Sequence, residues 1–195
     1  MTVATDPRET PRARAKADRR RAILDAASRL FAARGFDRVS MEELGSAAGV
    51  SGPAVYRHFP GKQSVLAALL IDVSRELVDR GSEVIDTGAD AAPTLRALIT
   101  FHVAFALANA DVIRVQDRDL ERLTPQEQHR VRNLQRNYVE LWVGVLTRLE
   151  DGADAADLRV KAHAAFGLIN STPHSGHSAA AGQILEAMAW AALGA

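Results

Sequence analysis

Residues 40–62 constrain the fold of this chain more than any other segment, because they encode two short helices and a tight turn between them. Ser40 and Glu43 have the spacing of a capping box, which predicts a helix that begins at Met41. Gly49 can adopt the positive φ that a sharp turn requires, so the first helix is expected to end there. The segment therefore predicts a helix, a glycine turn and a second helix.

The second helix of this pair presents a polar and cationic face. Ser51 can cap the helix, and Pro53 is tolerated because it falls in the first turn. Tyr56, Arg57 and His58 are left on the solvent side, while the apolar positions of both helices face a small core. Such a pair is typical of a helix-turn-helix whose second helix enters the DNA major groove. The expected core positions are Met41, Leu44, Ala48, Val50, Val55 and Phe59.

Residues 20–66 carry a wider set of positions at fixed spacings. The set comprises Ala26, Ala27, Leu30, Phe31, Gly35, Phe36, Ser40, Leu44, residues 47–51, residues 56–59, Lys62 and Leu66. It resembles the DNA-binding domain of the TetR (tetracycline-repressor) family, and the rest of the chain resembles that family only as a series of helices. The resemblance implies an all-α homodimer, with an N-terminal three-helix DNA-binding domain and a C-terminal domain that binds a small molecule and releases DNA.

The composition, considered apart from the resemblance, predicts a soluble cytoplasmic protein. The chain has 195 residues, of which 47% are hydrophobic, so it can bury a sizeable core. It contains no cysteine, which excludes a disulfide framework and a thiolate metal site and is expected in a reducing cytosol. The polar, cationic N-terminus does not have the form of a secretory signal, and no apolar run is expected to span a membrane.

A net charge of zero conceals a difference between the two ends of the chain. Residues 1–62 carry 12 Lys and Arg against 7 Asp and Glu, whereas the remainder carries 12 against 17. A basic N-terminal third on an acidic body suits a segment that faces DNA phosphates. A chance offset is the alternative, so the charge supports the DNA-binding interpretation without establishing it.

Three regions are expected along the chain. Residues 1–17 lack hydrophobic periodicity and are predicted to form a disordered basic arm, which either reaches DNA or is a solvated tail. Residues 18–66 are assigned to the helix-turn-helix domain and residues 67–195 to a ligand-binding and dimerisation domain. Helices are expected at about 18–34, 62–80, 93–108, 111–123, 125–150, 154–171 and 179–193, with a loop at 81–93 and no strand candidates.

DNA contacts are expected on the exposed face of the second motif helix. Arg57 is its only long cation and could read guanine bidentately, but positions around Tyr56 contact phosphate in the resembling family, so both roles stay open. Gly52 and Ala54 can offer only backbone amides or touch a thymine methyl. The resemblance implies phosphate contacts by Ser40, Tyr56, His58 and Lys62, which complete the predicted set together with Ser51, Gly52, Ala54 and Arg57.

The effector site is expected in the middle helices. Aromatic residues there could line a cavity, and polar residues that interrupt apolar stripes could converge on a bound molecule; each could equally be ordinary core. The apolar excess favours a small hydrophobic or amphipathic effector. The candidates are Phe101, His102, Phe105, Gln116, Asp119, Asn137, Tyr138, Trp142 and Phe166.

The last two expected helices are rich in small residues, with twelve alanines between residues 155 and 192. Small residues let helix backbones approach closely, so these helices predict an intermolecular bundle that joins two copies of the chain. Burial within one subunit is the alternative.

The predicted function is a ligand-responsive transcriptional repressor that binds a palindromic operator as a homodimer. A transcriptional activator, or a DNA-binding and dimerisation module without ligand control, is the alternative. No enzyme, cofactor or metal site is expected, since the chain has no phosphate-binding glycine loop and no nucleophile-elbow context. His174 and His177 form a short pair without a nearby carboxylate or cysteine, which is a weak metal signal.

Overall fold

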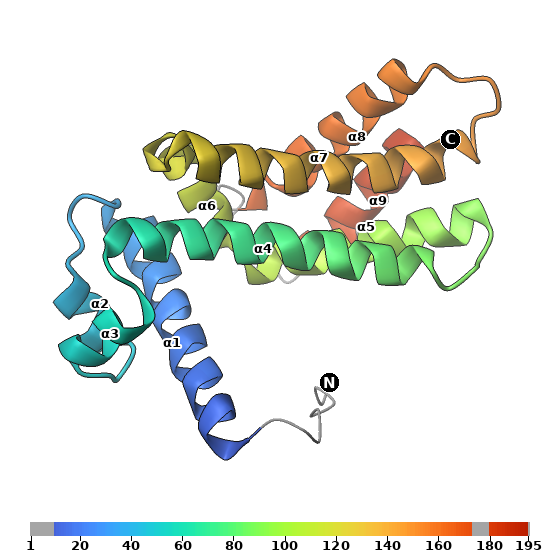
Figure 1. Cartoon of the computed structure of the whole chain (residues 1–195). Coiled ribbons are helices and arrows are strands. Elements are labelled where there is room, and N and C mark those ends of the chain that lie inside the picture. Colours follow the sequence, from blue (N-terminus) through green and yellow to red (C-terminus); the bar gives the residue numbers. More distant parts are fainter. Residues whose placement is uncertain (1–9, 173–179, 195) are drawn as a thin grey trace. The chain divides into compact units, whose positions relative to one another are not determined.

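The computed structural model describes residues 10–172 and 180–194, and throughout these ranges the regular elements are helices (Figure 1). The fold is all-α, as predicted. The elements are α1 Pro11–Arg34, α2 Met41–Ala47, α3 Gly52–His58, α4 Lys62–Ile85, α5 Ala91–Ala108, α6 Ala110–Asp119, the 3-10 turn η1 Leu120–Arg122, α7 Pro125–Thr147, α8 Ala155–Ile169 and α9 Ala181–Leu193.

The chain divides into two compact units, an N-terminal unit of Met1–Leu69 and a C-terminal unit of Leu70–Ala195. The division falls inside α4, close to the boundary expected between residues 66 and 67. The N-terminal unit contains α1, α2, α3 and the start of α4, and the C-terminal unit contains the remaining helices.

The first helix starts earlier than expected. Thr10 caps α1 by accepting a hydrogen bond from the backbone N–H of Ala13, and Pro11 occupies the first turn. The prediction of a disordered arm is therefore wrong from Pro11 onward, and residues 1–9 lie outside the described residues. Hydrophobic periodicity could not locate this start, because α1 buries no side chain before Ile23; alanine, arginine and the cap stabilise its first turns.

The helix-turn-helix forms as its local sequence predicts. Gly49 has a φ of 68°, which supplies the turn between α2 and α3. Gly45 was not recognised from the sequence, but a Cβ there would lie 3.0 Å from both the Val50 carbonyl oxygen and Val55 Cγ2. The two helices therefore pack too closely at Gly45 for a larger residue to fit without movement. Of the expected core positions, Met41, Leu44, Val55 and Phe59 are buried, while Ala48 and Val50 are partly buried.

In the C-terminal unit, α5, α7, α8 and α9 pack on one another around a single apolar core. A capping box of Thr124 and Glu127 is present at the start of α7. Three expected helix ends were wrong: α4 continues to Ile85 through part of the predicted loop, α6 ends at Asp119 and is followed by η1, and α7 ends at Thr147. The apolar residues Val84 and Ile85 pack against the core, which explains why α4 continues beyond the expected end.

The expectation that no segment is long and apolar enough to cross a membrane is wrong for α5. By length and composition, α5 reaches that limit, with a mean hydropathy of 1.4 over 18 residues. Eight of its side chains are buried, among them the polar Thr94 and His102, and it packs against α7 and α9. The core helix of a soluble protein has the same properties.

Candidate nucleic-acid interface and effector site

The start of α2 is fixed by reciprocal hydrogen bonds. Ser40 Oγ accepts from the Glu43 backbone N–H at 3.1 Å, and Glu43 Oε2 accepts from the Ser40 backbone N–H at 2.8 Å. Glu43 Oε1 also accepts from Arg34 at 2.6 Å. The Ser40 backbone N–H and Arg34 lower the pKa of Glu43. The predicted capping box is therefore confirmed, and Ser40 has a structural role whether or not it also contacts DNA.

The exposed face of α3 carries Tyr56 and Arg57, as expected. The Tyr56 side chain is 50% exposed, Arg57 is exposed, and His58 is partly exposed at the end of the helix. Ser51 is the N-cap residue, but its side chain makes no capping hydrogen bond. Ala54 is buried in the unit's core, which contradicts its expected place on the exposed tip and removes its methyl from the predicted contacts.

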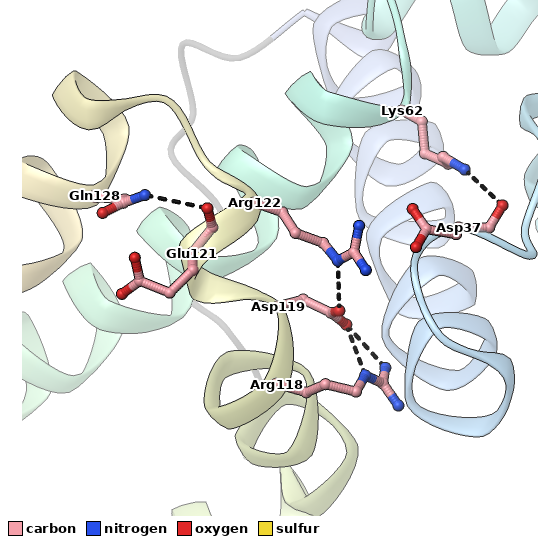
Figure 2. A network of polar contacts seen from close by, with 7 residues as sticks. All are labelled: Asp37, Lys62, Arg118, Asp119, Glu121, Arg122 and Gln128. Carbon is pink, nitrogen blue, oxygen red and sulfur yellow. Dashed lines mark hydrogen bonds and ion pairs between the residues drawn. The ribbon is translucent and has the colours of Figure 1, made fainter.

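Lys62 begins α4 and is held by two groups of the N-terminal unit. Its Nζ donates to the Asp37 carbonyl oxygen at 3.2 Å (Figure 2). The same Nζ lies 4.5 Å from the centre of the Phe36 ring. Gly52 is partly exposed at the start of α3, and Phe59 is buried as predicted. The structure thus keeps Tyr56, Arg57 and His58 together on one helix, and their contacts with DNA stay predictions.

The structure brings a further set of cations beside this helix. A hollow of about 640 Å³ is lined by the start of α1 and the end of α3, and its lining residues are Thr10, Arg12, Ala13, Lys16, Arg19, Arg57 and His58. Arg12 and Lys16 were expected to lie on a disordered arm and Arg19 at the start of the first helix, so the sequence could not place them beside Arg57 and His58.

In the C-terminal unit, six of the nine effector candidates form one aromatic cluster around His102. The His102 ring stacks on Phe166 at 4.8 Å between ring centres and on Tyr138 at 5.5 Å. Trp142 meets the His102 ring edge-on at 5.9 Å. Phe105 also contacts the His102 ring, and Phe101 contacts Phe105. We call these six residues, from α5, α7 and α8, the aromatic cluster.

Two hydrogen bonds fix the buried His102 side chain. Its Nδ1 lies 3.0 Å from the Tyr138 hydroxyl, and its Nε2 lies 3.2 Å from Asn170 Oδ1. Because an amide oxygen can only accept, the neutral ring carries its proton on Nε2 and accepts from Tyr138 at Nδ1. Asn170 was not predicted; it follows His102 by 68 residues, and no local sequence signal joins them.

Burial lowers the pKa of His102 to about 4 from 6.5, and the Asn170 hydrogen bond only partly opposes this change. The unfolded chain therefore binds more protons than the folded chain between these values. The stability that neutral His102 contributes is present above pH 6.5 and is lost as the pH falls through about 4.

We expect wild type to lose about 2–4 kcal/mol more unfolding free energy than His102→Leu between pH 7 and pH 4. Denaturant titrations across this range measure the difference. His163→Gln, which removes an exposed histidine of α8, is the control and should follow the wild-type pH profile. Parallel profiles for wild type and His102→Leu would contradict the lowered pKa.

Trp142 is fully buried, and its Nε1 has no hydrogen-bond partner among the described residues. Burial raises the pKa of the neighbouring Tyr138. A buried donor without an acceptor costs about 1–3 kcal/mol. The aromatic cluster therefore contains one polar group that an acceptor on a bound molecule could satisfy.

The other three effector candidates do not join the aromatic cluster. Asp119 is buried, and its carboxylate pairs with Arg118 at 2.8 Å and Arg122 at 3.2 Å (Figure 2). Its position in an apolar stripe is explained by this ion pairing. Asn137 is exposed on α7, and Gln116 is partly exposed on α6. These residues were selected from helical periodicity, which does not show which helix covers each face.

Exposed apolar side chains occur on the last two helices. The exposed fractions are 67% for Val160 of α8, and 52% and 50% for Ile184 and Met188 of α9. Small residues such as Ala164 and Gly167 of α8 are also exposed. Burial within one subunit thus accounts for only one face of each helix.

Within the described ranges, no three His, Asp or Glu side chains lie together as metal ligands. His174 and His177, the weak metal candidates, lie outside the described residues.

Comparison with known proteins identifies two family regions. Residues 23–69 match "Bacterial regulatory proteins, tetR family", and residues 88–174 match "Tetracyclin repressor-like, C-terminal domain". The first region contains the helix-turn-helix, and the second contains all three helices of the aromatic cluster.

Three similar proteins illustrate the range of these matches. The transcriptional repressor KstR2 of Rhodococcus jostii is 29% identical over 75% of this chain and 72% of its own length. The nucleoid occlusion factor SlmA of Vibrio vulnificus is 33% identical over a segment that covers 51% of this chain and 52% of SlmA. FadR of Bacillus subtilis, solved with stearoyl-CoA, has a TM-score of 0.73 at 17% identity over 89% of this chain and 97% of its own, a likeness of fold.

Proposed function

Since this chain belongs to the TetR family of bacterial transcription regulators, we propose that it is a repressor that binds a palindromic operator as a homodimer and is released by a small hydrophobic or amphipathic effector. The N-terminal unit would bind DNA in the cytoplasm. The C-terminal unit would bind the effector and join the two copies. The observation that carries the proposal is the capped helix-turn-helix, whose α3 exposes Tyr56 and Arg57.

Selection of bound DNA from random sequence tests the operator. We expect an inverted repeat, as two-fold symmetry requires, with half-sites separated by about one helical turn or a multiple of it. Recovery of no preferred sequence, together with no salt-sensitive DNA binding, would contradict the proposal.

Replacing Tyr56 and Lys62 together with alanine should weaken binding to every sequence, because phosphate contacts do not depend on the base. Arg57→Ala should instead relax the preference at one base pair of each half-site, at a cost of about 1–3 kcal/mol, if Arg57 reads guanine. Binding titrations against operator and single-base variants measure both effects. Arg130→Ala removes an exposed arginine of the C-terminal unit and is the control. Equal weakening by Arg57→Ala on every sequence would assign Arg57 to a phosphate.

The aromatic cluster is the proposed effector site. Its support is the combination of stacked rings, a buried hydrogen-bonded histidine and the unpaired Trp142 N–H. An effector with an apolar body and a carbonyl acceptor would suit these groups, and the stearoyl-CoA bound to FadR has both. A panel of fatty acids and acyl-CoA esters can be screened by fluorescence of a Trp190→Phe variant, in which Trp142 is the remaining tryptophan.

The proposed homodimer joins α8 and α9 of two copies. The exposed Val160, Ile184 and Met188 supply apolar area for this contact, and the small residues beside them allow close approach of the helices. Two-fold symmetry would place the same faces opposite each other.

A DNA-binding protein without ligand control is the second candidate. It is favoured by the dense packing of His102, Tyr138 and Trp142, each at most 3% exposed. A ligand that releases operator DNA would exclude this candidate.

A further inference from the structure

The first three turns of α1 contribute no buried side chain, yet they form a regular helix. Arg12, Lys16 and Arg19 are spaced by four and three residues, so they share one face of this helix. That face lines the hollow described above, opposite Arg57 and His58 of α3. The start of α1 thus forms one side of the hollow, and the end of α3 forms the other.

The position of α1 relative to α3 is supported by a stacking contact. The guanidinium of Arg20 lies 5.6 Å from the centre of the Phe59 ring, at the end of α3. Phe59 is buried, so the contact joins the basic face of α1 to the packed part of the N-terminal unit. The hollow is therefore part of one folded unit.

The hollow has an excess of positive charge. Among the described residues, no carboxylate lies within ion-pair distance of Arg12, Lys16, Arg19 or Arg57. Burial lowers the pKa of His58, and Lys16, Arg19, Arg57 and Arg20 lower it further. Among the described residues, the charged groups that lower the pKa of His58 are all cations. An anion in the hollow would relieve their mutual repulsion.

We infer that the hollow binds a phosphate of the DNA backbone beside the bases that α3 faces, and that His58 accepts a proton when this phosphate enters. The inference rests on the proposed DNA-binding function. Arginine forms paired hydrogen bonds with phosphate oxygens, and lysine adds a mobile point charge. A phosphate also favours the charged form of a neighbouring imidazole, so its entry reverses the effect of the surrounding cations.

The pH dependence follows from this change. In the free protein the pKa of His58 lies below 6.5, and the bound phosphate raises it. DNA binding then takes up a proton between the two values, so affinity increases as the pH falls through this window. The gain is about tenfold per unit of pKa change at each bound N-terminal unit.

The first test uses the full chain and the selected operator at several salt concentrations. The double variant Lys16→Gln, Arg19→Gln should decrease the slope of log affinity against log salt by about 2 for each N-terminal unit. Arg29→Gln is the matched control, because Arg29 is exposed on α1 but does not line the hollow. A wild-type slope in the double variant would overturn the inference while leaving the proposed DNA binding intact. No salt-dependent binding by wild type would instead contradict the proposed function itself.

The second test follows the imidazole signals of His58 by NMR, assigned by their loss in His58→Gln. Operator DNA should raise the pKa of His58, and the pH dependence of affinity from about pH 8 to about pH 6 should be smaller in His58→Gln than in His163→Gln. An unchanged pKa on DNA binding would overturn the inference. Inorganic phosphate at matched ionic strength distinguishes the source: a rise as large as that with DNA would identify a site for free phosphate.

Discussion

Met188→Glu is expected to separate the proposed homodimer into monomers and to lower operator affinity at least about a hundredfold, because the second half-site no longer binds as part of the same molecule. Met188 is 50% exposed in the single chain, so the substitution leaves the subunit's own core largely intact. In the dimer it would place an unpaired carboxylate in each copy of an apolar interface, which costs several kcal/mol.

Sedimentation measures the oligomeric state, and operator titration measures the affinity. Asn137→Glu is the matched control, since it adds the same charge at an exposed position of α7 and should remain dimeric. If Met188→Glu fails to fold, Ile184→Glu on the same exposed face provides the second variant. A dimeric Met188→Glu with wild-type operator affinity would place the interface elsewhere.

Trp142→Ala is expected to lower the free energy of unfolding by about 3–5 kcal/mol. The Trp142 side chain is fully buried and contacts the rings of His102, Tyr138 and Phe166, so truncation leaves a cavity at the centre of the aromatic cluster. The thermal midpoint should fall by roughly 6–20 °C for a chain of this size. Calorimetry at fixed protein concentration measures both quantities.

Trp190→Ala is the matched control, because Trp190 is only partly buried and stacks on Arg96 at 3.5 Å. Its loss should cost less than that of Trp142. Trp142→Phe keeps most of the packing and removes the unpaired N–H, so its cost should also be smaller. Equal destabilisation by Trp142→Ala and Trp190→Ala would show that the cluster is not the centre of the core.

These stability effects limit how the effector site can be tested. Trp142→Ala and His102→Leu each change the core as well as the proposed site, so an altered effector response in either variant would have two causes. Phe166 is only partly buried and stacks on His102, which makes Phe166→Leu the milder variant for ligand titrations.

The helix-turn-helix could be predicted from the sequence because its determinants are local. The capping box of Ser40 and Glu43 and the turn at Gly49 each act within four residues, and the structure contains both. The start of α1 is also local, but its signal is the Thr10 cap and not a hydrophobic stripe. Apolar periodicity therefore does not reveal that residues 11–17 are helical.

Placement of the side chains within each unit required the tertiary structure. His102, Asp119 and Asn137 all occur within or beside apolar helical stripes, but the structure places them in different surroundings. His102 is buried in the aromatic cluster, Asp119 pairs with arginines, and Asn137 is exposed. Asn170 lies beside His102 only because α8 packs in the same core as α5. Periodicity shows that a helix has an apolar face, but contacts between distant residues depend on how several helices pack together. The sequence by itself therefore determined the helix-turn-helix. Only the tertiary structure decided the surroundings of each proposed site residue.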